Sequence, residues 1–149
     1  MSKAAIVSSP SGVNGYREKA ISLNNLGCEF KRNGQFLKAI SHLKEAVAIE
    51  NLIGSAASNP SGTHLNLCSI YSEMGDHKTA VSHAKQALQI LCLNKELNQL
   101  LEQVQSDPTI RIPIDSSGGG LVQVLSVTYH NLAVEQEFLH RHSPCYFLL

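Results

Sequence analysis

Tryptophan is absent from this 149-residue sequence, and phenylalanine and tyrosine together supply only 5% of it. An excess of one charge is also lacking: twelve basic and twelve acidic side chains cancel, and no run of like charge occurs. Nucleic-acid interfaces need a basic stripe, and membrane surfaces attract polybasic segments. We therefore expect no nucleic-acid partner and no membrane partner, which leaves protein as the expected partner.

Long hydrophobic runs are missing too. No apolar stretch approaches the roughly 20 residues that a membrane-spanning helix needs. The first twelve residues contain one lysine and an apolar run too short for a secretory signal peptide. These absences predict a cytoplasmic protein.

Paired metal-ligating and nucleophilic residues are also lacking. The four cysteines, at 28, 68, 92 and 145, form no C-x-x-C pair, and we interpret them as reduced thiols. His42 and His83 fall at equivalent places of two similar segments, so we do not expect them to share an ion. No Ser, His and Asp set and no phosphate-cradling loop can be assembled. We expect no enzyme activity, no metal and no cofactor.

The sequence does contain strong helical periodicity. Between residues 23 and 50, apolar side chains recur at helical spacing on either side of an Arg-Asn-Gly turn that ends at Gly34: Leu23, Leu26, Phe30, Phe36, Ile40, Leu43 and Val47. This pattern predicts two helices packed as a hairpin, and an all-α fold. Small residues stand where the two helices would touch, at Gly27, Ala39 and Ala46.

A second copy of the hairpin follows, each position 41 residues after its counterpart. Leu67, Tyr71, Gly75, Ala80 and Ala87 repeat Leu26, Phe30, Gly34, Ala39 and Ala46. The glycine- and serine-rich stretch 54–62 is expected to be the loop between the copies. The last helix of this copy is predicted to run unbroken to about Gln105, because its apolar pattern continues that far.

A third copy is only half present. Tyr129 and Leu132-Ala133 stand where its first helix would have them, but no second helix follows. Its apolar face, from Val122, Leu125, Tyr129 and Leu132, is expected to pack on the second copy. The predicted organisation is a disordered tail (1–14), two hairpins (15–105), a flexible linker (106–120), the first helix of a truncated third copy (121–141) and a second tail (142–149).

The repeated positions resemble the tetratricopeptide repeat, with Leu26-Gly27, Phe30, Gly34, Ala39 and Ala46 in its consensus places. Each copy also has an Asn-Leu pair in its first helix, beginning at Asn25, Asn66 and Asn131, and these surroundings look like the NNLA-type repeats of kinesin light chains and related adaptors. The resemblance implies a helical solenoid of two complete hairpins and a half repeat. It also implies a scaffold or adaptor, with cytoskeletal association possible.

In such relatives the first helices line a groove that holds an extended peptide or a partner helix. The resemblance places in this groove Asn24, Asn25, Cys28, Lys31 and Arg32 from the first copy, Asn66, Ser69 and Glu73 from the second, and His130, Asn131 and Val134 from the half copy. An amide can donate to and accept from a peptide backbone, which suits Asn25, Asn66 and Asn131 to ligand contact. Alternatively, these asparagines bond across neighbouring helices and fix their stacking.

A second interpretation of the function stays open. The chain is then a structural subunit, or a truncated form of a larger repeat protein, whose surfaces are permanently covered. The half copy has no helix of its own to cover its far side, so self-association through this C-terminal helix is possible.

Overall fold

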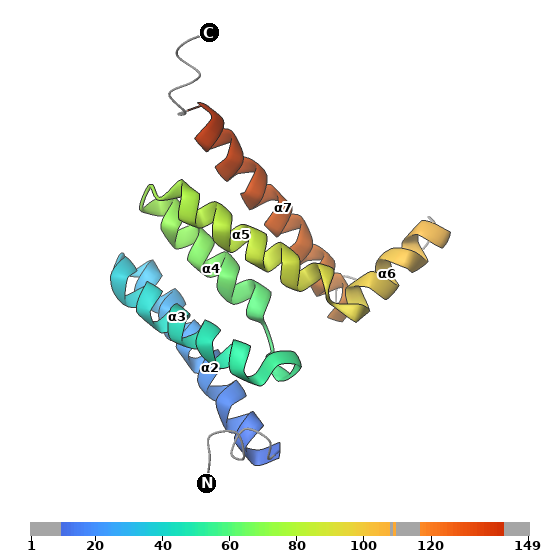
Figure 1. Ribbon diagram of the computed structural model, residues 1–149, viewed down its shortest axis with the longest axis horizontal. Helices are drawn as coiled ribbons and strands as arrows, with labels where there is room; N and C mark the ends of the chain where they lie inside the picture. The colour runs from blue at the N-terminus through green and yellow to red at the C-terminus, as the bar shows by residue number, and fades with distance from the viewer. Residues whose placement is uncertain (1–9, 108, 110–116, 142–149) are drawn as a thin grey trace.

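The computed structural model describes residues 10–107, 109 and 117–141. Within these ranges every regular element is helical, which confirms the predicted all-α fold. The helices are α2 (Pro10–Arg32), α3 (Phe36–Ile53), α4 (Pro60–Glu73), α5 (His77–Cys92), α6 (Lys95–Ser106) and α7 (Ser117–Arg141), with a short 3-10 helix, η1 (Gly54–Ala56), after α3. Figure 1 shows α2 with α3, then α4 with α5, then α7, laid side by side as in a solenoid.

Both hairpins turn in the same way, at a glycine with a left-handed backbone. Gly34 has φ 71° and Gly75 has φ 80°, a region that L side chains rarely adopt. The residue after each glycine donates its N–H to the carbonyl of the aromatic residue five positions earlier, Gln35 to Phe30 at 2.9 Å and Asp76 to Tyr71 at 2.8 Å. The two turns therefore contain the same backbone hydrogen bond at equivalent positions of the repeat.

Small residues allow the helices of each hairpin to approach closely, as predicted. Ala39, Ala46, Ala80 and Ala87 have no exposed surface. A Cβ atom added at Gly27 would lie 2.6 Å from Cγ of Leu43, closer than real Cβ atoms come to other atoms. The backbone of α2 thus lies directly against a buried leucine of α3.

The two hairpins share one core. Ala39, Ile40 and Leu43 of α3 pack against Leu67 and Ile70 of α4 in a buried cluster. Leu26, the counterpart of Leu67 on α2, is 39% exposed, because no described helix lies on that side of α2. Burial at this repeat position depends on the neighbouring hairpin and not on the residue itself.

Helix α7 takes the place of the first helix of a third repeat. It lies along α5 and α4, and Leu132 packs against Cys68, Ala80 and Ala84. Thr128 and Glu135 are buried on the same helix, whereas Tyr129 is 54% exposed. The prediction that Tyr129 lies on the packing face is wrong: Thr128, one residue earlier, takes that direction, since adjacent helical residues point about 100° apart.

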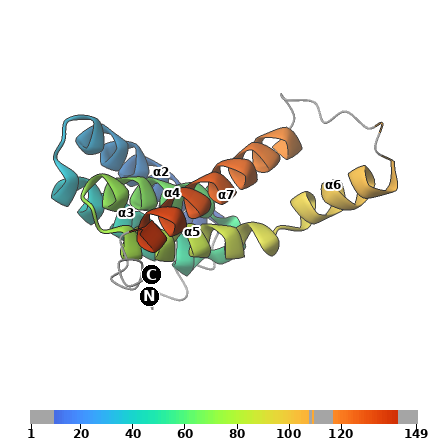
Figure 2. The same cartoon turned by 90° about the horizontal axis from the view of Figure 1, so that it is seen from above.

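The long helix predicted to run to Gln105 is in fact two helices. α5 ends at Cys92, and α6 begins at Lys95 and extends away from the repeats (Figure 2). Asn94 makes the break: its backbone is extended, and its side-chain oxygen accepts the N–H of Leu97 at 2.9 Å as a helix N-cap. An apolar pattern alone does not reveal a capping residue within it.

Three other boundaries differ from those predicted. α2 begins at Pro10, so residues 10–14 are helical and not a tail; proline suits a first helical turn, where its missing N–H costs nothing. α4 begins at Pro60 for the same reason and shortens the expected loop, which also contains η1. Residues 106 and 117–120 of the expected linker are helical. Residues 1–9, 108, 110–116 and 142–149 lie outside the described residues, as do the predictions that fall on them.

Over the helices that the structure describes, none combines the length and the apolar character that crossing a membrane requires.

Candidate functional site

The first helices of the two complete hairpins are joined by polar side chains. Nζ of Lys31, on α2, lies 2.6 Å from Oγ of Ser69 and 3.2 Å from Oε1 of Glu73, both on α4. Asn66 of α4 donates from Nδ2 to Oδ1 of Asn24 at 3.0 Å. The spacing of seven residues from Asn24 to Lys31 on α2, and spacings of three and four residues on α4, put these side chains on one side of each helix. A continuous polar surface therefore crosses from α2 to α4.

The same surface continues to α7 through a cavity. This cavity has a volume of about 190 Å³ and is lined by Cys68, Ser69, Ser72 and Glu73 of α4 and by His130, Asn131, Val134 and Glu135 of α7. Ser69 and Glu73 belong both to the cavity and to the contacts with Lys31. We call this region the first-helix surface; its predicted members are Asn24, Cys28, Lys31, Asn66, Ser69, Glu73, His130, Asn131 and Val134.

The cavity wall carries negative charge. Glu73 and Glu135 line it, and its described lining residues include neither lysine nor arginine. Glu135 is only 4% exposed, and its Oε2 lies 2.6 Å from Nδ1 of His77 on α5. The His77 ring stacks on Phe138 with the centroids 3.6 Å apart. These contacts tie α7 to α5 beneath the cavity and hold its wall in place.

Cys68 lies at the floor of the cavity but is not a nucleophile. Burial, together with the nearby charge of Glu135, raises the pKa of its thiol to about 11. The thiolate is the reactive form of cysteine, so a thiol that stays protonated at neutral pH is inert. Its small size instead serves the contact between α4 and α7.

Comparison with known families explains this arrangement. Residues 18–51 and 62–90, which span the two hairpins, match the family model described as tetratricopeptide repeat. These two segments are similar to tetratricopeptide repeats. No curated protein and no solved structure matches the chain significantly. Tetratricopeptide repeats are scaffolds without catalytic groups of their own and generally mediate protein–protein interaction.

Two residues predicted for the groove line another hollow, on the first repeat. Asn25 and Arg32 line a separate hollow of about 470 Å³, whose described lining residues all belong to α2: Glu18, Ile21, Ser22, Asn25, Leu26, Glu29 and Arg32. This side of α2 corresponds to the side of α4 that packs on α3. Asn66, the counterpart of Asn25 on α4, is bonded to Asn24 of α2. That Asn25 and Arg32 share one groove with Asn66 stays a prediction.

The three asparagines of the Asn-Leu pairs have different surroundings. Asn25 is exposed, Asn66 is bonded to the neighbouring helix, and Asn131 lines the cavity. The alternative interpretation, in which an asparagine fixes the stacking of repeats, therefore describes Asn66.

The histidines at the repeated position are half-buried and stack on aromatic rings. His42 stacks on Phe30 in the first repeat, and His83 stacks on Tyr71 in the second. Nδ1 of His83 also lies 3.0 Å from Nδ1 of His64. The two ring centroids are 5.3 Å apart, so the nitrogens lie almost on the line between them and point at each other. This is the geometry of a hydrogen bond and not of two ligands converging on one ion.

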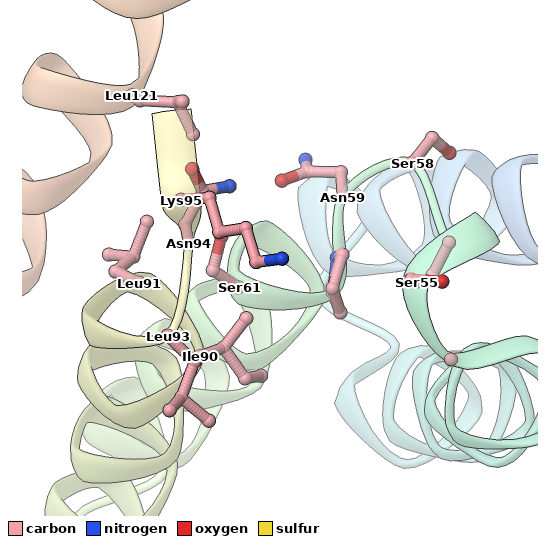
Figure 3. Close-up of a pocket in the computed structure, with 13 residues that line it drawn as sticks. Ser55, Ser58, Asn59, Ser61, Ile90, Leu91, Leu93, Asn94, Lys95 and Leu121 are labelled. Carbon is pink, nitrogen blue, oxygen red and sulfur yellow. The ribbon is translucent and has the colours of Figure 1, made fainter. Parts of the chain in front are cut away.

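Sequence reasoning did not find a larger cavity, of about 480 Å³, at the far end of the second repeat (Figure 3). The loop between the repeats, the end of α5, and the beginnings of α6 and α7 form its walls. The cluster of serine and asparagine in the loop was the available signal, but only the break between α5 and α6 brings Lys95 to it.

Proposed function

We propose that this chain is a protein–protein interaction scaffold or adaptor that holds an extended peptide, or a partner helix, on the first-helix surface. The supporting observation is the cavity between α4 and α7, because it is lined by both donors and acceptors and is continuous with the polar contacts of α2. The repeats match a family of binding scaffolds. We propose no catalytic role for it.

In this proposal Asn131 is the asparagine that contacts the ligand. Its half-buried amide lines the cavity, and an amide can pair with a peptide main chain through both a donor and an acceptor. The amide of Asn66 already donates to Asn24, so its role is to keep α2 and α4 in register. The resemblance to kinesin light chains and related adaptors further suggests a cytoplasmic protein, with cytoskeletal association.

Affinity purification with matched variants tests the proposal. The full chain and two variants, Asn131→Ala and Asn25→Ala, are used as baits, and bound proteins are quantified by mass spectrometry. Asn131→Ala should reduce recovery of the specific partner about fivefold, the effect of losing one hydrogen bond of about 1 kcal/mol. Asn25→Ala, on the other side of α2, should recover it fully. Equal recovery with both variants would move the site off the first-helix surface.

A second function is favoured by the uncovered side of α7. In each complete repeat, one side of the first helix packs on the second helix. This side contains Leu23 and Gly27 on α2, and His64 and Cys68 on α4. The corresponding residues on α7 are Tyr129 and Ala133. Both are exposed. We propose as the alternative a structural subunit in which another chain, or a second copy of this one, covers this side.

Sedimentation velocity separates the two functions. If α7 is permanently covered, purified protein should sediment as an oligomer, and Tyr129→Gln should shift it to monomer without lowering its melting temperature. Leu37→Gln, at an exposed leucine of α3, is the control and should leave the oligomer unchanged. A monomer at all concentrations would reject self-association.

A further inference from the structure

The cavity of about 480 Å³ at the end of the second repeat is lined by both polar and apolar side chains. Figure 3 shows Ser55, Ser58 and Asn59 on the loop side and Ile90, Leu91 and Leu93, from α5 and its end, on the other, with Ser61 drawn beside Lys95 and Leu121 of α7 above them. No aspartate or glutamate is among its described lining residues. The cavity is therefore suited to a ligand that carries both a polar and an apolar part.

Ser61 is a buried residue whose hydroxyl is open to the cavity and has no partner among the described residues. The residue is only 6% exposed and lines the cavity near the beginning of α4. Within the described part of the chain its hydroxyl forms no hydrogen bond, although Asn59 beside it accepts the N–H of Gly62 as the helix cap. Because this hydroxyl is not cut off from solvent, its donor and its lone pairs are free for a ligand in the cavity.

Lys95 supplies a positive charge over the same space. It is the first residue of α6, and Figure 3 shows its side chain extending across the cavity toward Ser61 and Asn59. Among the described residues its ammonium has no ion-pair partner. A cation at a helix N-terminus faces the partial positive charge of the helix, and the N-terminus of α4 lies at the same cavity. Glu96, the next residue, does not line it.

The groups around the cavity are held in place before any ligand arrives. Arg17 of α2 donates from Nε to the carbonyl of Ala56 at 2.7 Å, which anchors the loop to the first repeat. On the opposite side the cap of Asn94 on Leu97 fixes the start of α6, and with it the position of Lys95. A preorganised site loses little conformational entropy on binding.

We propose that this cavity binds the oxyanion of a small organic molecule, a phosphate or carboxylate group attached to an apolar body. The anion accepts hydrogen bonds from Ser61 and Lys95, and the apolar body lies against Leu91 and Leu121. This site is separate from the first-helix surface and does not depend on the function proposed for it.

Titration of the full chain, followed by ¹H–¹⁵N NMR, tests the site. The probes are inorganic phosphate, phenyl phosphate and benzoate, each at ionic strength matched with sodium chloride. We expect saturable shifts at the amides of Ser61 and Lys95, with dissociation constants on the order of millimolar for the inorganic ion. Phenyl phosphate should bind more tightly than inorganic phosphate, because its ring contacts the apolar lining residues. Whichever of phenyl phosphate and benzoate has the lower dissociation constant then shows which anion the site prefers.

Two variants and one control decide the outcome. Lys95→Gln and Ser61→Ala should each weaken binding about tenfold, as expected for losing a hydrogen bond to a charged group. Lys85→Gln, at an exposed lysine of α5, should bind as the original chain does. The amide spectrum of each variant shows whether it is folded. Any of three results would overturn the proposal: equal shifts with sodium chloride alone, no saturable shift with any probe, or equal affinity of Lys95→Gln and Lys85→Gln.

Discussion

Acid should destabilise this protein through the buried histidine pair between α4 and α5. Burial, then the neighbouring His64, then Lys44 lower the pKa of His83 from 6.5 to about 4. Burial also lowers the pKa of His64. Between pH 6.5 and pH 4, His83 binds a proton in the unfolded chain but not in the folded protein. Its contribution to stability is therefore complete above pH 6.5 and is lost as pH falls toward 4.

The size of this effect follows from the shift. At about 1.4 kcal/mol per pKa unit, the His83 shift corresponds to at most about 3 kcal/mol between pH 7 and pH 4. The ring is partly accessible to solvent, which screens its charge and reduces the expected loss to about 2 kcal/mol. Tyr71, stacked on the His83 ring, and Lys44, over Tyr71, offer no negative charge that would favour the imidazolium.

Urea denaturation followed by circular dichroism, at pH 7, 6, 5 and 4.5, measures the loss directly. His83→Phe keeps a ring against Tyr71 but cannot be protonated, so its free energy of unfolding should depend less on pH than that of the original chain. His42→Phe is the matched control, because His42 stacks on Phe30 at the equivalent place of the first repeat. If His83→Phe and His42→Phe lose stability equally between pH 7 and pH 4.5, the buried pair is not the cause.

Three further substitutions test the packing and the buried charges. Gly27→Ala should lower the free energy of unfolding by roughly 1 to 3 kcal/mol through overpacking, whereas Gly15→Ala, with open space around its Cβ, should not lower it; equal melting temperatures would refute the close contact. His77→Ala leaves Glu135 buried without its partner and should cost roughly 3 kcal/mol, with faster amide exchange along α7. Glu50 has one oxygen without a partner in the described part of the chain, and burial raises its pKa despite the hydrogen bond from Thr63. Stability should therefore fall as pH rises through 4.5 toward that raised value, and Glu50→Gln should abolish this fall in pH-dependent urea titrations.

The sequence alone was sufficient to predict the features of the fold that depend on local periodicity. The hairpin pattern, the turn glycines at 34 and 75, and the small residues from Gly27 to Ala87 are encoded within one repeat length, and repetition at a constant register confirmed each assignment independently. The place of α7 as the first helix of a half repeat followed from the same register. These features recur because close packing within each hairpin requires a small residue at the same places, as Ala39 and Ala46 in the first copy and Ala80 and Ala87 in the second.

Only the tertiary structure decided which side of each helix meets a neighbour. Asn25 and Asn66 occupy the same place in the repeat, yet Asn25 is exposed and Asn66 is bonded to α2, because a hairpin precedes the second copy but none is described before the first. Tyr129 is exposed for the corresponding reason at the other end. Asn94 breaks an apolar pattern that looked continuous, and this break brings Lys95 to the loop between the repeats. Each of these outcomes depends on contacts between residues far apart in the chain, which a local pattern does not contain.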